Sequence, residues 1–442
     1  MKFSKKIAIA AVPAVMALAS TNVDSKILLM SQEGWEVSFD GAANAFVMKN
    51  SGDAAPTTTG GAALTPSTYG AVSGASDDTS IVTGLLPNVW GMTLKAPTAN
   101  GLDVSARLGL YTHMNGGDNS LGNGQLNIRE TSGSVSGSFG TVLVGRSLGI
   151  HQSNAILSDM LLFGVGAAAS ASNSNTTLGR IGLGYLYTDF KPQISWTLPS
   201  MAGFGAKIGI FDPDDVIADT AGLGATEGTS PRVEAQITYN GDFQGLGINL
   251  WVDGTYQSTD RTTSELNSVN NIAATASKAD GATLTAAQET ASADNRDDVE
   301  SAGVGFGTKL TYDAFSLVAT GFYGHGLGIR GQRATGATAT GAIDDFGKER
   351  KTYGGYIQGT FDFGQGTSVG YSYGGNFMKK NGRDMNALGT MNGQIMHSGM
   401  IWHNVTDNFR LVAEGGYTEK SWYLADYDQE DSFGGVGAFF FW

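Results

Sequence analysis

Few residues of this 442-residue sequence stand at spacings that would support enzymatic chemistry. There is no cysteine, which excludes thiolate nucleophiles and thiolate metal sites. His397 and His403 would share one face of a strand, but the rise along a strand separates them by about 20 Å, too far for one metal ion. Asp212, Asp214 and Asp215 are more typical of a solvated loop than of a calcium site. No serine, histidine and aspartate set has a defensible spacing, so we expect neither an enzyme nor a cofactor.

The composition favours a large β protein. Glycine numbers 64, about twice its usual share, whereas charged residues make up only 15% and aromatic residues reach 10%. A collagen would need glycine at every third position, and a disordered chain would hold few aromatic residues. The net charge of −14 excludes a typical nucleic-acid-binding protein, which needs a basic face.

The first segment has the pattern of a secretory signal peptide. Three lysines within the first six residues precede an apolar run at 7–18, and Ala17-Leu18-Ala19 provides a small-x-small cleavage signal. The run is too short for the ~20 residues of a spanning helix. We therefore expect residues 1–19 to be removed and residues 20–442 to form a single domain. Either a soluble exported protein or an outer-membrane barrel would fit this signal.

Hydrophobic residues alternate with polar residues along much of the chain. In RVEAQITY, residues 232–239, the four hydrophobic residues fall on one face of a strand and the four polar residues on the other. The same two-residue period recurs at 102–110 and near 409–417. This period predicts strands with one apolar and one polar face, which a soluble sandwich would also show.

The connections distinguish the two possibilities, because short turns and long polar loops alternate. Short turns are predicted at 97–101, 137–138, 199–203, 240–245, 312–315, 364–366 and 404–408. Long loops are predicted near 49–86, 114–124, 147–178, 212–231, 257–300, 324–350, 374–392 and 419–431. This alternation is typical of an outer-membrane barrel with tight periplasmic turns and long outer loops.

The predicted fold is all-β, a transmembrane antiparallel β-barrel of about 16 strands. The strands are placed at 35–48, 87–96, 102–113, 125–136, 139–146, 179–198, 204–211, 232–240, 246–256, 301–311, 315–323, 351–363, 367–373, 393–403, 409–418 and 432–442. Barrels of 16–18 strands leave a water channel, whereas a barrel of about 8 is filled by side chains. Aromatic residues at Trp35 and at 439–442 would lie in the interfacial belts.

Three segments resemble the general porins of Gram-negative bacteria. Residues 132–146, SGSVSGSFGTVLVGR, are similar to a strand–turn–strand in that family that reads roughly G-x-FGTV-x-x-GR. Residues 147–166 resemble its third loop, which folds inward and narrows the pore, and residues 179–187 resemble the segment that returns to the wall. The chain differs in ending on Trp instead of Phe and in its long first and fifth outer loops.

The resemblance implies a constriction in which acidic residues of the inward loop face a basic cluster on the wall, so that a transverse field sorts solutes by charge. Asp159 is the only acidic residue between Gly149 and Arg180, which makes it the candidate negative pole. The candidate basic residues are Arg107, Arg180 and Lys95, which alternation places inward, and Arg146, which matches the arginine of the family motif although alternation would turn it outward.

We therefore expect a porin of the Gram-negative outer membrane, a passive diffusion channel for small hydrophilic solutes and ions. Two alternatives stay open: a channel selective for anionic or carboxylate solutes, and a surface adhesin or receptor barrel with an occluded pore. The expected partners are outer-membrane lipid and lipopolysaccharide, the solutes, and two further copies in a homotrimer, with no nucleic acid. Small residues at Gly305 and Gly307, or at Gly434, Gly435 and Gly437, suggest a flat outer wall for that packing.

Overall fold

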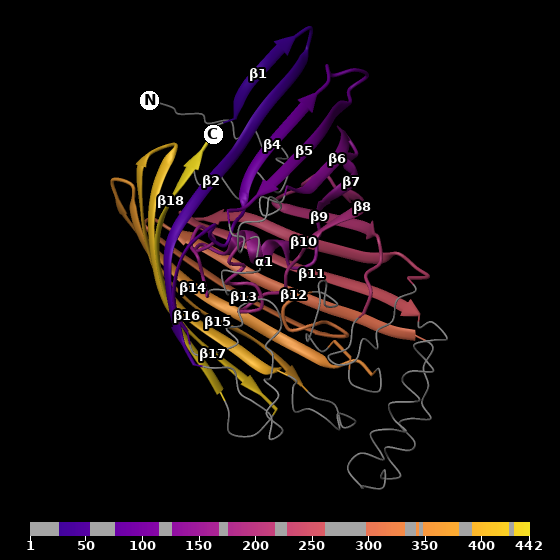
Figure 1. Ribbon diagram of the computed structural model, residues 1–442. Coiled ribbons are helices and arrows are strands. Elements are labelled where there is room, and N and C mark those ends of the chain that lie inside the picture. Colours follow the sequence, from indigo (N-terminus) through magenta and orange to yellow (C-terminus); the bar gives the residue numbers. More distant parts are fainter. Residues whose placement is uncertain are drawn as a thin grey trace.

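The computed structural model describes residues 26–53, 76–114, 126–167, 176–216, 228–260, 298–331, 342–343, 348–379, 391–423 and 428–442 (Figure 1). Sixteen antiparallel strands close into a barrel, and two further strands are added to it. The sixteen are β2 (Trp35–Gly52), β4 (Asn88–Lys95), β5 (Asp103–Thr112), β6 (Asn127–Gly137), β7 (Gly140–Leu148), β8 (Phe190–Thr197), β9 (Phe204–Phe211), β10 (Arg232–Phe243), β11 (Leu246–Asp260), β12 (Asp298–Tyr312), β13 (Phe315–His325), β14 (Lys351–Gly364), β15 (Thr367–Lys379), β16 (Met391–Thr406), β17 (Phe409–Trp422) and β18 (Asp428–Phe441). The predicted all-β barrel is confirmed. The predicted signal peptide, residues 1–19, lies outside the described residues.

The barrel closes between its first and last strands. β18 pairs with β2 from Phe441 opposite Ala42 to Asp431 opposite Gly52. The terminal Trp442 extends this contact, since its backbone nitrogen and oxygen both bond to Gly41. Closure gives every wall strand two neighbours, which removes the open edges that a flat sheet would expose.

Each predicted short turn joins two consecutive strands. Several of them are two-residue turns in which both central residues have positive φ, such as Gln244 (53°) with Gly245 (87°) and Gln365 (53°) with Gly366 (82°). This turn type has the twist that antiparallel strands need, and glycine takes its second position without strain.

Two strands are absent from the sequence prediction. β1 (Ile27–Gln32) pairs with the start of β2, and β3 (Ser76–Val82) pairs with the end of β2 at positions that were predicted as part of a loop over 49–86. β3 and β4 share one edge of β2, and the break between them is held by Asn44, whose Oδ1 accepts a bond from Gly84 N at 2.7 Å.

The predicted strand 179–198 is wrong in its first half. Only β8, Phe190–Thr197, belongs to the wall, and residues 179–189 form turns inside the barrel. Gly182 and Gly184 have φ values of 82° and 134°, which break the extended backbone. The alternating Ile181, Leu183 and Tyr185 are buried because they pack inside the barrel, not because they face a membrane.

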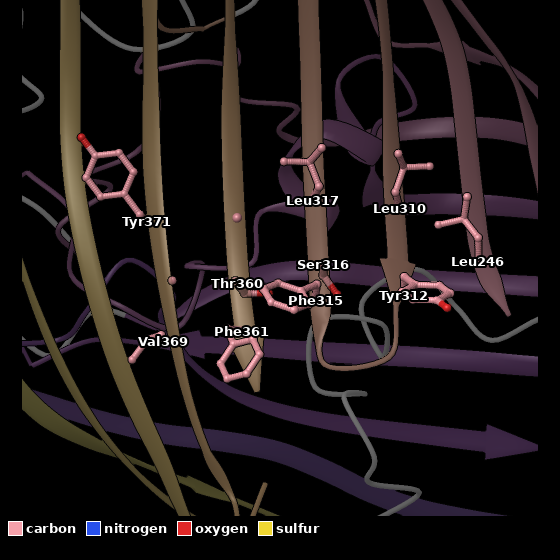
Figure 2. A pocket seen from close by; sticks show the side chains of 12 residues that line it. Leu246, Leu310, Tyr312, Phe315, Ser316, Leu317, Thr360, Phe361, Val369 and Tyr371 are labelled. Atoms are coloured by element: carbon pink, nitrogen blue, oxygen red, sulfur yellow. The ribbon is translucent and has the colours of Figure 1, made fainter. Parts of the chain in front are cut away.

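The outer wall is apolar. A shallow depression of about 500 Å³ lies on it over β11 to β15. Figure 2 shows side chains that line this depression, such as Leu310, Phe315, Leu317 and Phe361. Gly359 has no atom within 4 Å of the place where a Cβ would lie, so the wall is hollowed there. Within the described residues, no helix is long and apolar enough to span a membrane.

Candidate functional site

The connection between β7 and β8 folds into the barrel, and we call its described parts, residues 149–167 and 176–189, the inner loop. It contains the helix α1 (Ser153–Ser158), which lies inside the ring of strands in Figure 1. Nearly all of its residues are buried or half-buried. The inner loop therefore occupies part of the lumen, as expected for an inward-folded third loop.

Carboxylates of the wall hold the start of the inner loop. Glu234 of β10 accepts bonds from the backbone nitrogens of Ile150 (2.7 Å) and His151 (2.9 Å). Asp253 of β11 accepts one from Gln152 N at 3.0 Å and lies 2.5 Å from His151 Nδ1. Backbone N–H groups that would otherwise be buried without partners are thus satisfied by charged acceptors, which make stronger hydrogen bonds than neutral ones.

Asp159 lies at the end of α1 and is 4% exposed. Its carboxylate accepts bonds from Gln358 Nε2 (2.5 Å), Tyr185 OH (2.9 Å) and Leu161 N (3.0 Å). Arg180 Nε is 3.9 Å away. Asp159 is thus surrounded by donors of the inner loop and of β14.

Arg180 joins the returning part of the inner loop to the opposite wall. Its Nη2 donates to Glu414 Oε1 of β17 at 2.6 Å and to Ser398 Oγ of β16 at 2.5 Å. The other oxygen of Glu414 accepts bonds from Val165 N (2.7 Å) and Gly166 N (3.0 Å). A single buried carboxylate therefore fixes both limbs of the loop.

The ionisation of this cluster is set by its burial and its two acids. Burial alone would lower the pKa of the Arg180 guanidinium, but the Asp159 and Glu414 carboxylates outweigh it and raise this pKa above its ordinary value. Burial, with Asp159 beside it, raises the pKa of the Tyr185 hydroxyl well above its ordinary value. Arg180 stays charged and Tyr185 stays a hydrogen-bond donor.

A second inward segment, residues 326–331 after β13, packs against the inner loop. Tyr187 N donates to Arg330 O at 2.8 Å. Asn376 of β15 joins the two segments, because its Nδ2 donates to Tyr185 O (3.1 Å) and to Ile329 O (2.8 Å) while its Oδ1 accepts from Gly184 N (3.0 Å). The returning limb of the inner loop is therefore held from two sides.

A separate ionic cluster lies on the wall of β2, β5 and β6. Arg107 makes a two-pronged contact with Asp40, at 2.7 and 2.9 Å, and its Nε lies 3.3 Å from Glu130 Oε2. Tyr111 OH donates to the same oxygen of Glu130 at 3.1 Å. Leu157 of α1 packs against the cluster of Tyr111, Leu148 and Phe190, so this wall stands beside the inner loop.

The structure divides the predicted site residues among different places. Asp159 and Arg180 come together in one cluster, and Arg107 belongs to the other. Lys95 is exposed at the end of β4. Arg146 is paired in register with Thr131 and Pro192 and shares the outer face with Leu108, so it points away from the lumen and the expectation that it lines the constriction is wrong. Among the described residues, neither Lys95 nor Arg146 joins an ion pair of the two clusters.

Sequence reasoning missed the wall acids Glu234, Asp253 and Glu414. Alternation does place each of them on the inner face of its strand, since Val233, Val252 and Ala413 take the outer face. It gives no sign that they bind backbone N–H groups, because their partners lie 83 to 249 residues away.

Residues 7–382 match the sequence profile of one protein family, which is described as "Gram-negative porin". The chain belongs to this family. Its members are channels and not enzymes, as expected here, and they lie in the outer membrane. Comparison with curated proteins gives no match.

Solved structures of outer-membrane proteins share the barrel of this porin. The outer membrane channel DcaP of Acinetobacter baumannii is similar with a TM-score of 0.64 at 14% identity, covering 93% of this chain and 99% of its own. An anion-selective porin from Comamonas acidovorans follows with 0.56 at 13%, covering 92% and 100%. OmpF of Salmonella typhi, in complex with daunomycin, gives 0.50 at 14%, covering 93% and 99%. At such identities the likeness shows the fold, and the family match makes the protein an outer-membrane channel.

Proposed function

We propose that this porin is a passive diffusion channel for small hydrophilic solutes and ions. Its narrowest part would lie between the inner loop and the wall that carries Arg107, Asp40 and Glu130. The observation that supports this most directly is the fixation of the inner loop by buried carboxylates of the wall, because a loop held in place inside a wide barrel reduces the cross-section permanently.

Charge selection would fall mainly to Arg107 and its two acids. Asp159 and Arg180 would act by holding the loop in position, since their hydrogen bonds join it to β14, β16 and β17. Lys95 is exposed and would add to the field along the solute path. Arg146 lies on the outer face of the wall and would not contribute to this field. Charges at a narrow point act more strongly than those in loop tips, where screening falls off over about 8 Å at physiological salt.

Reconstitution in planar bilayers tests this function. We expect stepwise, ohmic single-channel currents, and in liposome swelling assays a permeation rate that falls steeply with solute size. An adhesin or receptor with an occluded pore would give no conductance and no swelling. A solute-selective channel would conduct, but swelling would follow the chemical class of the solute instead of its size, which is the result that favours that alternative.

We also propose a homotrimer embedded in outer-membrane lipid and lipopolysaccharide. Gly399, Gly415 and Gly434 stand side by side in register across β16, β17 and β18 on the outer face, where they form a flat row. Of the glycines that the sequence suggested, only Gly434 belongs to it, because a Cβ at Gly307 or Gly435 would meet Trp251 or Val165 inside the barrel.

Gly415→Trp should convert the trimer into monomers, because the indole would stand out from the flat row. Native mass spectrometry in mild detergent measures the result. Gly359→Trp is a matched control on the outer wall of β14, where a Cβ would meet open space, and it should leave the trimer intact. A monomeric wild type, or dissociation by both variants alike, would contradict the proposal.

A further inference from the structure

Arg129 of β6 faces the lumen although the alternation of its strand would turn it outward. The register of β5 and β6 shifts between Gly109 and Leu110, so that Glu130 pairs with Gly109, Ile128 pairs with Leu110 and Arg129 is left as the extra residue. Such a bulge re-aims a side chain. Arg129 therefore joins Glu130 on the inner side, and its guanidinium lies over the ring of Tyr111, 5.1 Å from the centroid.

The surroundings of Arg129 are aromatic and apolar. Its guanidinium is 5.9 Å from the ring centroid of Phe190, and Nη1 donates to Tyr187 OH of the inner loop at 3.4 Å. Leu157 of α1 packs on the cluster of Tyr111, Leu148 and Phe190. The guanidinium thus lies where the wall and the inner loop meet.

Arg129 differs from Arg107, Arg180 and Arg232 in its charge balance. Among the described residues, no carboxylate forms an ion pair with it, whereas Arg107, Arg180 and Arg232 each contact one or two acids. It is also only half-buried, while those three are buried. A half-buried guanidinium without a paired acid can receive an anionic solute.

Beside Arg129 the inner loop presents the apolar side chain of Leu157. A solute at this point meets that side chain on one side and a guanidinium with aromatic rings on the other. A guanidinium fork binds a carboxylate through two parallel hydrogen bonds, and apolar side chains favour an apolar body.

We infer that Arg129, Tyr111, Phe190, Tyr187 and Leu157 form a binding subsite for small organic carboxylates with an apolar body. This rests on the proposed diffusion function and names the solute class that the channel would favour. Such a solute would place its carboxylate on the guanidinium and its apolar body along Leu157.

Solute block of single-channel current in chloride salt tests the subsite with benzoate, acetate, benzyl alcohol and benzylammonium as probes. Benzoate should reduce the current in a saturable way, with a half-blocking concentration about tenfold or more below that of acetate, because acetate lacks the ring. Benzyl alcohol and benzylammonium should block weakly, because they lack the anion. Equal block by benzoate and acetate, or stronger block by benzylammonium, would overturn the inference.

Substitutions test which residues cause the block by benzoate. Arg129→Gln should raise the half-blocking benzoate concentration about tenfold or more, and Arg129→Lys should give an intermediate value because it keeps the charge without the fork. Leu157→Ser should weaken benzoate and leave acetate unchanged. Lys309→Gln removes a lysine on the inner face of β12 and should not change the block, which separates the subsite from general lumen charge.

The outcomes separate this inference from the proposed function. A wild type without conductance would contradict the diffusion channel itself. Normal conductance with benzoate block that survives Arg129→Gln would overturn the subsite alone. Each variant is first checked for a heat-modifiable barrel on gels, and Arg129→Lys and Leu157→Ser still test the subsite if Arg129→Gln does not fold.

Discussion

Replacing Glu414 by glutamine should release the inner loop and raise the single-channel conductance. The glutamate binds Arg180 at 2.6 Å and two backbone nitrogens of the loop, Val165 and Gly166, with one buried side chain. Glutamine has a single acceptor oxygen for these donors, and its amide group would face one of them. Breaking a buried pair costs about 3–5 kcal/mol because the partner's charge is left uncompensated. The sixteen wall strands keep their own pairing, so the barrel should remain.

Bilayer recordings of Glu414→Gln should show a larger mean single-channel conductance and increased current noise. Glu36→Gln is the matched control, since Glu36 is an exposed carboxylate near the start of β2 and should leave the conductance at the wild-type value. A folded Glu414→Gln barrel that conducts like the wild type would show that this carboxylate does not hold the loop.

Arg107→Ala should shift the channel strongly toward cations. The guanidinium compensates both Asp40 and Glu130, and its removal leaves two carboxylates on the same wall without a countercharge. Both acids are buried, so the loss should also destabilise the barrel by about 3–5 kcal/mol.

The reversal potential in a salt gradient measures the permeability ratio, which should rise several-fold for cations over anions. Arg107→Lys keeps the charge and should stay near the wild type in selectivity. The double variant Arg107→Ala with Asp40→Asn removes one acid together with the arginine, so its reversal potential should lie close to the wild-type value. An unchanged reversal potential in Arg107→Ala would place the selectivity elsewhere.

Alternation was sufficient to predict the barrel, because each wall strand has one face toward the apolar exterior and one toward the lumen. The same signal failed at residues 179–189, where apolar residues alternate but pack inside the barrel. A two-residue period shows which side chains are kept from water. It does not show whether they face the membrane or pack inside the barrel. Arg180 does lie inside the barrel, but it belongs to the inner loop and not to the wall strand that alternation predicted there.

The site was less accessible to sequence reasoning, for two physical reasons. The partners of Asp159 and Arg180, such as Gln358 and Glu414, are distant in sequence and meet them only through closure of the barrel. Arg129 faces inward through a one-residue bulge, whereas strict alternation along β6 would turn it outward. Arg107 was placed correctly because β5 keeps its own alternation, and the extra residue of the bulge lies on β6.

The contact between Val165 and Glu414 joins residues 249 positions apart. Glu414 lies on β17, so the inner loop has no acceptor for these N–H groups until the last strands have been added to the wall. Contacts between distant parts of a chain form slowly, because the long intervening segment must first be ordered. A wall without β17 is therefore also a wall without the carboxylate that holds both limbs of the inner loop, so the final shape of the lumen depends on one of the last strands of the chain.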